Sequence, residues 1–203
     1  MRFIRKLYHG TSNEAAELIL QSKEMIPGDD GDNEDYLGKA IYFFDDIDEA
    51  LDWNIGLYKK KCRKMNEKKR LNYYTIIRDY KVIEADISIE NSEILNLNDK
   101  RMLKSILELY KEYIDVLKCR YSNSFKGNFA EFINYMYEEK LIDYKMIKKD
   151  FNRSTAYRTK MNDGRFTQWS RTVYAVKDKS VINDIRLCAN ITKQDYKEVE
   201  YFC

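Results

Sequence analysis

The chain has 203 residues and a mass of 24.4 kDa, which fits one domain or one domain with an insertion. Hydrophobic residues make up 44% of it and aromatic residues 14%, which is enough apolar surface for a packed core and excludes wholesale disorder. Because 36 basic residues face 34 acidic ones, any binding to nucleic acid or anionic lipid would need a local patch.

The N-terminal third predicts a strand, a helix, a strand and a second helix. Residues 3–8 form a short segment with aromatic and aliphatic side chains, and it stops at the turn-forming residues 9–12, which also supply a helix cap. Apolar residues at helical spacing predict a helix from residue 13 to about 23. Residues 38–44 form a compact apolar strand entered through a glycine, and a further helix begins at about 47.

The rest of the chain places helices between strands. In residues 73–77 and 82–89, apolar and polar residues alternate, which predicts strands. In residues 99–117 and 129–136, apolar residues recur at helical spacing, which predicts helices. Residues 172–176 and 181–187 are two further predicted strands. This order favours an α+β fold over a regular βαβ alternation, with one domain over 1–203 and a helical insertion at about 99–160, packed beside the sheet.

The single histidine of the chain, His9, stands where the first strand ends. Gly10 lets a ligand approach the backbone closely, and Thr11 offers a hydroxyl group. The junction from strand to helix also exposes backbone N–H groups that suit a polar ligand. The alternative is an ordinary capped helix that uses a glycine for its turn.

Two segments carry short motifs in a fixed order. The first is Tyr-His-Gly-Thr at 8–11, and the second is Gly-Lys-Ala-Ile-Tyr-Phe at 38–43. They resemble the two NAD-binding segments of ADP-ribosyltransferases of the poly(ADP-ribose) polymerase and diphtheria toxin type. Residues 82–87 with 94–97 resemble a strand and loop of small bacterial and phage-borne members, and residues 173–178 and 181–187 resemble the last strands of the same fold. The resemblance implies a split β-sheet core with an inserted helical region.

The resemblance also implies NAD as co-substrate and assigns roles to residues. His9 would hydrogen-bond a ribose hydroxyl, Gly10 would hold the nicotinamide carboxamide through its backbone, and Thr11 belongs to the same NAD-binding segment. Tyr42 would stack on the nicotinamide ring, and Trp53 falls where relatives place a second aromatic side chain. His9, Gly10, Tyr42 and Trp53 are therefore predicted to line one pocket, with His9 and Tyr42 close together and not on opposite faces of the sheet. The alternative for Tyr42 and Trp53 is ordinary core.

The chain departs from the family at the start of the penultimate strand, where relatives carry Glu or Gln and this chain has Val173. Two nearby residues are candidate replacements. Arg171, on the same face as Val173 by strand alternation, would pair with a phosphate or an acidic group, because arginine stays protonated and cannot act as a base. Gln168 would offer a neutral acceptor to the ribose hydroxyl. Alternatively, Arg171 is an exposed residue at a strand end.

The missing carboxylate leaves two functions open. The chain is either a mono-ADP-ribosyltransferase that uses another group, or a module that binds NAD or ADP-ribose without transfer. The resemblance suggests a toxin or a phage-defence effector acting on protein or nucleic acid. The helices of 103–136 would then recognise the target or be covered by an antitoxin.

A basic run, Lys59 to Arg70, carries eight positive charges and one negative charge. Such a run is usually a solvated face. If it is a binding surface, phosphates are its natural partner, and Tyr58, Tyr73 and Tyr74 would stack on bases.

Targeting and redox features favour a cytoplasmic protein. No run approaches the roughly 18 to 20 apolar residues of a transmembrane helix, so no membrane partner is expected, and the N-terminus lacks a signal-peptide core. The 4 cysteines are widely spaced, without a C-x-x-C pair, and there is 1 histidine. We therefore expect reduced thiols and no metal site.

Overall fold

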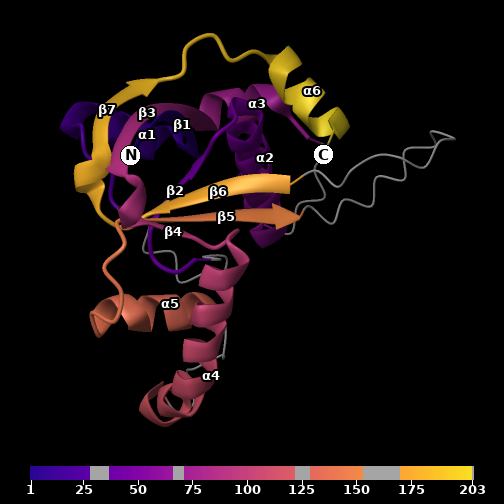
Figure 1. Ribbon diagram of the computed structural model, residues 1–203. Helices are drawn as coiled ribbons and strands as arrows, with labels where there is room; N and C mark the ends of the chain where they lie inside the picture. The colour runs from indigo at the N-terminus through magenta and orange to yellow at the C-terminus, as the bar shows by residue number, and fades with distance from the viewer. Residues whose placement is uncertain (28–36, 66–70, 122–128, 153–169, 203) are drawn as a thin grey trace, which may run out of the picture.

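Seven strands form one mixed sheet in the order β4-β5-β6-β2-β1-β3-β7 (Figure 1). The structure, a computed structural model, describes residues 1–27, 37–65, 71–121, 129–152 and 170–202. The strands are β1 (Arg2–Ser12), β2 (Ile41–Phe44), β3 (Tyr80–Glu90), β4 (Ile94–Asn96), β5 (Met146–Asn152), β6 (Ser170–Val176) and β7 (Ile182–Leu187). The helices are α1 (Asn13–Ser22), α2 (Ile47–Lys64), α3 (Tyr73–Asp79), α4 (Lys100–Tyr121), α5 (Phe129–Glu138) and α6 (Lys193–Phe202). The α+β class predicted from the sequence is confirmed.

Two halves of the sheet meet at a narrow junction between β1 and β2. β1 pairs with β3 along its whole length, and β7 completes that half. β2, β6, β5 and β4 make the other half, in which β4 and β5 run parallel. Over the described residues of β1 and β2, the register between the two strands is a single pair, Tyr8 with Phe44. Because β1 continues to Ser12 and β2 starts at Ile41, the strands diverge beyond this pair and leave a gap.

Helices cover both faces of the sheet. One buried cluster gathers Leu7, Phe43 and Tyr174 with Ala16 of α1. The other cluster, on the opposite face, gathers side chains of α2, α3 and α6 and extends to α4 and α5, which lie beneath β4, β5 and β6 in the view of Figure 1. Among the described residues, no helix combines the length and apolar character needed to span a bilayer.

The strand predicted at 73–77 was wrong, because this segment is the helix α3. The side chain of Asn72 caps it by accepting a hydrogen bond from the Thr75 N–H, with a nitrogen–oxygen distance of 3.2 Å. Ile76 is fully buried in the core, and Tyr80, four residues later, is buried as well. Buried residues four positions apart fit a helix as well as a strand, and the cap at Asn72 favours the helix.

The predicted helices in the middle of the chain are confirmed as α4 and α5, but the insertion of about 99–160 was drawn too long. Residues 146–152 form β5, which lies inside the sheet between β4 and β6. Residues 153–160 lie outside the described part. The helix α6 was not predicted from the sequence. It packs against α2 and α3 and contributes the buried Tyr196.

Candidate functional site

A cavity of about 520 Å³ opens at the gap between β1 and β2. Residues 9–12 at the end of β1 line one side, and Ile41, Tyr42 and Phe44 of β2 line the other. α1 and the segment after it add apolar side chains, and α2 adds Trp53 and Leu57. This volume lies within the range of small-molecule sites. The divergence of the two half-sheets therefore creates a site that could receive a ligand.

Four residues were predicted to line one pocket, and they border one cavity together with Thr11. His9, Gly10, Thr11, Tyr42 and Trp53 all line this cavity, and β1 and β2 are sheet neighbours as that prediction required. Their roles toward NAD stay predictions.

His9 bridges the gap between the two half-sheets. Its Nδ1 lies 2.7 Å from the carbonyl oxygen of Tyr42, so Nδ1–H donates and the neutral ring keeps Nε2 as a hydrogen-bond acceptor. Burial lowers the pKa of His9 below its usual value, and the bond to the Tyr42 carbonyl opposes that shift. The ring is therefore neutral at pH 7 and offers an acceptor, not a positive charge.

His9 and Tyr42 approach the cavity from different sides of the sheet. The His9 ring lies 5.8 Å from the Phe43 ring, which belongs to the buried cluster beside α1. Tyr42 packs instead with the cluster that contains Phe44 and the side chains of α2. Both border the cavity because it lies in the gap, but they lie on opposite faces of the sheet. The prediction that they share a face was therefore wrong, and this arrangement counts against the interpretation of the cavity as an NAD site.

Gly10 allows β1 and α2 to lie in direct contact. A Cβ atom at this buried position would stand 2.6 Å from the Ala50 carbonyl oxygen and 2.6 Å from Oδ1 of Asn54. Asn54 is fully buried, and its Nδ2 donates to the Lys81 carbonyl (3.1 Å) and the Tyr196 hydroxyl (3.3 Å). Its Oδ1 has no hydrogen-bond partner within the described chain. This contact fixes α2, and with it Trp53, against the cavity.

The side chain of Tyr42 is held at its far end. Its hydroxyl donates to the Gly38 carbonyl (2.6 Å) and accepts the N–H of Leu37 (3.1 Å). What Tyr42 offers to a ligand is therefore its ring. The Trp53 ring lies 5.9 Å from that of Phe44, tilted by 45°, so the lining on the α2 side is an aromatic pair.

Arg171 is not among the residues that line the cavity. Its Nε bonds to Glu49 and its Nη2 to Asp52, both on α2, and its guanidinium lies 5.2 Å from the centre of the Phe44 ring. The side chain is 16% exposed, so it is not a free strand-end residue either. Glu49 and Asp52 were not among the predicted site residues, although they stand three residues apart at the start of a predicted helix and so share one face.

The other two residues considered at the position of the missing carboxylate are Gln168 and Val173. Gln168 lies outside the described residues. Val173 is buried and pairs with Phe44 in the sheet, so it presents no polar group. A carboxylate that does line the cavity is Glu24, whose pKa is lowered by its ion pair with Lys179 at 2.8 Å. Over the described part of the chain, no group of three or more His, Cys, Asp or Glu is arranged to hold a metal ion.

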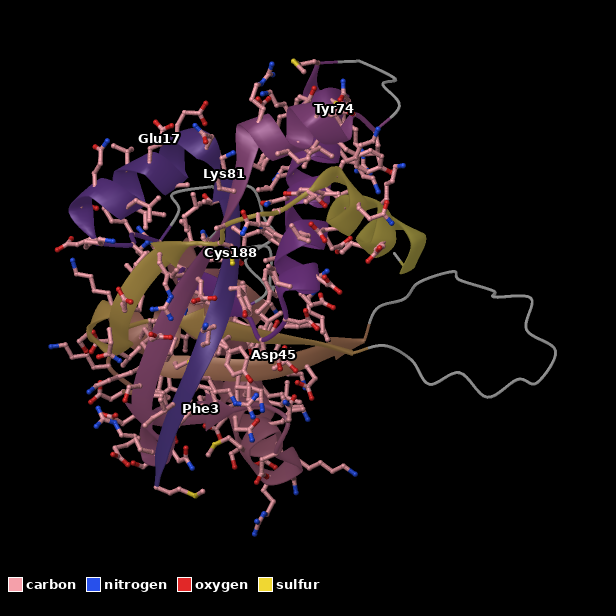
Figure 2. All side chains as sticks on the ribbon, turned by 90° about the horizontal axis from the view of Figure 1, so that it is seen from above. Phe3, Glu17, Asp45, Tyr74, Lys81 and Cys188 are labelled. Atoms are coloured by element: carbon pink, nitrogen blue, oxygen red, sulfur yellow. The ribbon has the colours of Figure 1, made fainter. Side chains whose placement is uncertain are left out.

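The basic run leads away from the cavity at the C-terminal end of α2. The structure describes the first part of this run, residues 59–64. Within it, Nζ of Lys61 lies 3.5 Å from Oδ2 of Asp79. Tyr58 is buried, so it cannot stack on a base as predicted, and Tyr73 is half-buried. Tyr74 is 69% exposed, and Figure 2 shows it on the outer edge of the molecule, far from the end marked by Phe3.

The chain is 29% identical over 203 residues to an uncharacterized protein of Methanocaldococcus jannaschii. That match covers 91% of this chain and 88% of the relative, so the likeness spans nearly the whole of both. No protein-family model matches the chain, and no solved structure matches it.

Proposed function

We propose that the chain is an NAD-dependent mono-ADP-ribosyltransferase that moves ADP-ribose from NAD to a macromolecular target. The observation that carries the proposal is the cavity at the junction of the two half-sheets. It is lined by residues from both motifs that resemble the NAD-binding segments of ADP-ribosyltransferases, although these lie more than 25 positions apart in the sequence. The division of the sheet at Tyr8 and Phe44 also agrees with the split core that the resemblance implies.

The side chains of the cavity fit the parts of NAD in chemical terms. Nε2 of His9 is a neutral acceptor, which suits a ribose hydroxyl. Tyr42 and Trp53 offer aromatic rings, and stacking on a planar cation contributes roughly 0.5 to 2 kcal/mol for each ring. Gly10 also borders the cavity, and its backbone would hold the carboxamide of nicotinamide, whereas the space beside its Cα is filled by α2.

NAD supplies an ADP-ribosyl group with a good leaving group, nicotinamide. The transfer breaks the bond between ribose C1′ and the nicotinamide nitrogen, which keeps the electron pair. It joins C1′ to a nucleophile of the target, whose proton passes to solvent. The contribution of the chain is to hold the leaving group and the ribose so that binding strengthens as positive charge develops on the sugar.

A second candidate is a module that binds NAD or ADP-ribose without transfer. Two observations favour this module. Glu24, a carboxylate that lines the cavity, is engaged in an ion pair with Lys179, and the buried Val173 stands where relatives carry their polar residue. Under either proposal, the resemblance to bacterial and phage-borne members suggests a toxin or phage-defence effector. Its target would be protein or nucleic acid, and α4 and α5 offer a surface for that target or for an antitoxin.

Incubation of the protein and a cell lysate with NAD labelled in the adenosine part separates these candidates. We expect nicotinamide release and labelled macromolecules, with both lost in His9→Ala and Tyr42→Ala. Digestion with protease or with nuclease then identifies the class of target. Phe3→Ala, which removes a half-buried aromatic ring from the far end of the same strand, is the matched control and should retain release.

Each remaining outcome has a defined meaning. Saturable NAD binding without nicotinamide release supports the binding module. If the protein neither binds NAD nor releases nicotinamide, both candidates are refuted.

A further inference from the structure

A lysine outside the cavity holds the turn that precedes β2. Lys177 follows the last residue of β6, and its Nζ donates to the carbonyl oxygens of Leu37 (2.9 Å) and Lys39 (2.8 Å). The same Nζ lies 4.9 Å from the centre of the Tyr137 ring on α5. An ammonium group has three N–H bonds, so it can serve two carbonyl groups and an aromatic face together.

The turn that Lys177 holds is also the anchor of Tyr42. The Tyr42 hydroxyl donates to the carbonyl of Gly38 and accepts the N–H of Leu37, which are groups within that turn. The position of the ring that lines the cavity therefore depends on the position of residues 37–39. Lys177 fixes two carbonyl groups of this segment, so it acts on the cavity wall indirectly, through the turn that holds Tyr42.

α5 supports the turn from the other side. Oδ1 of Asn134 accepts the N–H of Lys39 at 2.6 Å. Gly38 has a φ of +75°, and a Cβ atom there would stand 2.3 Å from the same Oδ1 and 3.0 Å from the Ala130 carbonyl oxygen. The turn is thus pressed against α5 in a backbone conformation that other residues rarely adopt. Interactions from Lys177 and α5, rather than a strand ladder, hold it in place.

We propose that Lys177 is a positioning residue of the cavity, which fixes the turn of residues 37–39 and thereby the ring of Tyr42. It is not among the cavity-lining residues, so it works through Tyr42 and not by touching a ligand. The inference rests on the proposed function only where it names nicotinamide as the group that Tyr42 receives. It also makes α5 part of the support of the site, although the sequence suggested a separate insertion.

Three variants test the proposal. Lys177→Met keeps the aliphatic stem and removes the N–H donors, whereas Lys177→Arg keeps a charged donor with a different shape. Lys145→Met is the matched control, because Lys145 is also half-buried, lies beside the backbone of Lys177, and forms an ion pair with Glu93 at 2.7 Å that is unconnected with the turn.

The first measurement needs no ligand. Amide hydrogen exchange at Leu37 and Lys39 should become about tenfold faster in Lys177→Met, because two charge-assisted hydrogen bonds to the turn are lost. Lys177→Arg should restore much of the protection, and Lys145→Met should leave it unchanged. Wild-type exchange rates in Lys177→Met would overturn the proposal, whatever the protein does with NAD.

The second measurement follows NAD binding through Trp53. The chain has 2 tryptophans, so a Trp169→Phe background leaves Trp53 as the sole fluorescent indole. Lys177→Met should raise the dissociation constant for NAD about tenfold, while Lys145→Met should not change it. Faster exchange with unchanged NAD affinity would also overturn the positioning role. If wild-type protein does not bind NAD, the proposed function fails, and the exchange measurement alone decides whether Lys177 fixes the turn.

Discussion

Replacement of Gly10 with alanine tests the contact between β1 and α2 that shapes the candidate site. The new Cβ would stand 2.6 Å from the Ala50 carbonyl oxygen and from Oδ1 of Asn54, about 0.7 Å closer than the roughly 3.3 Å of the closest C–H···O contacts. The Ala50 oxygen belongs to a helix backbone, and Asn54 is fixed by its bond to the Lys81 carbonyl. Neither can retreat alone, so α2 must move.

The cost of that movement can be estimated from its parts. Overpacking of a well-packed contact costs about 1–3 kcal/mol, and loss of the Asn54 hydrogen bond adds roughly 1 kcal/mol. We therefore expect Gly10→Ala to lower the free energy of unfolding by about 2–4 kcal/mol, which corresponds to a melting temperature roughly 4–16 °C lower for a chain of this size. Trp53 and Leu57 move with α2, so ligand affinity should fall as well.

Urea unfolding followed by circular dichroism measures the effect, and the chain offers a matched control. Gly56 is an exposed glycine within α2, and a Cβ atom there would meet no other atom within 4 Å. Gly56→Ala should therefore stabilise the protein, by up to about 1 kcal/mol, because alanine favours the helix. The two substitutions are the same chemical change in touching elements, yet they should have opposite signs. A Gly10→Ala protein as stable as wild type would refute the reasoning.

Two further predictions concern charged groups. Since burial lowers the pKa of His9 below the 6.5 of the unfolded chain, the stability that it contributes is complete above pH 6.5 and declines as the pH falls through the folded pKa. Urea unfolding at pH 7.5 and 5.5 should show a smaller pH effect in His9→Gln, and an unchanged pH effect would contradict the burial argument. Arg171→Met should lower the free energy of unfolding by about 1–3 kcal/mol, because Glu49 and Asp52 are 14% and 22% exposed and lose their shared guanidinium. Thermal unfolding should show a smaller loss for Glu49→Gln, and equal stability of Arg171→Met and wild type would show that the pairs contribute nothing.

Local sequence signals predicted the start of α1, because Ser12 caps this helix by accepting the N–H of Ala15 at 3.2 Å. The turn predicted at 9–12 was wrong, because these residues continue β1 and pair with β3 as far as Ser12. β3 and β6 extend a few residues beyond their predicted ranges of 82–89 and 172–176. β3 was recognisable because buried apolar residues alternate with half-buried polar ones, and β6 because its residues 173–176 form a continuous buried apolar run.

The same signals failed where neighbours in space supply the partners. β5 has polar residues at 148–150, yet it lies inside the sheet because Lys149 reaches the Leu97 carbonyl (3.0 Å) and Asp150 accepts the Thr172 hydroxyl (2.9 Å). Those partners lie 22 to 52 positions away in the sequence, so no local pattern announces them.

For the candidate site, the sequence by itself determined which residues come together. The resemblance of the two motifs to NAD-binding segments implied that His9, Gly10, Tyr42 and Trp53 line one pocket, and these residues do line one cavity. Only the tertiary structure decided how they are held. The approach of Tyr42 from the side of the sheet opposite to His9, and the capture of Arg171 by two carboxylates of α2, depend on the divergence of β1 from β2 and on the placement of a helix. A residue's own sequence neighbourhood fixes its backbone conformation, whereas its charge partners and the wall it faces are set by segments that fold against it from elsewhere in the chain.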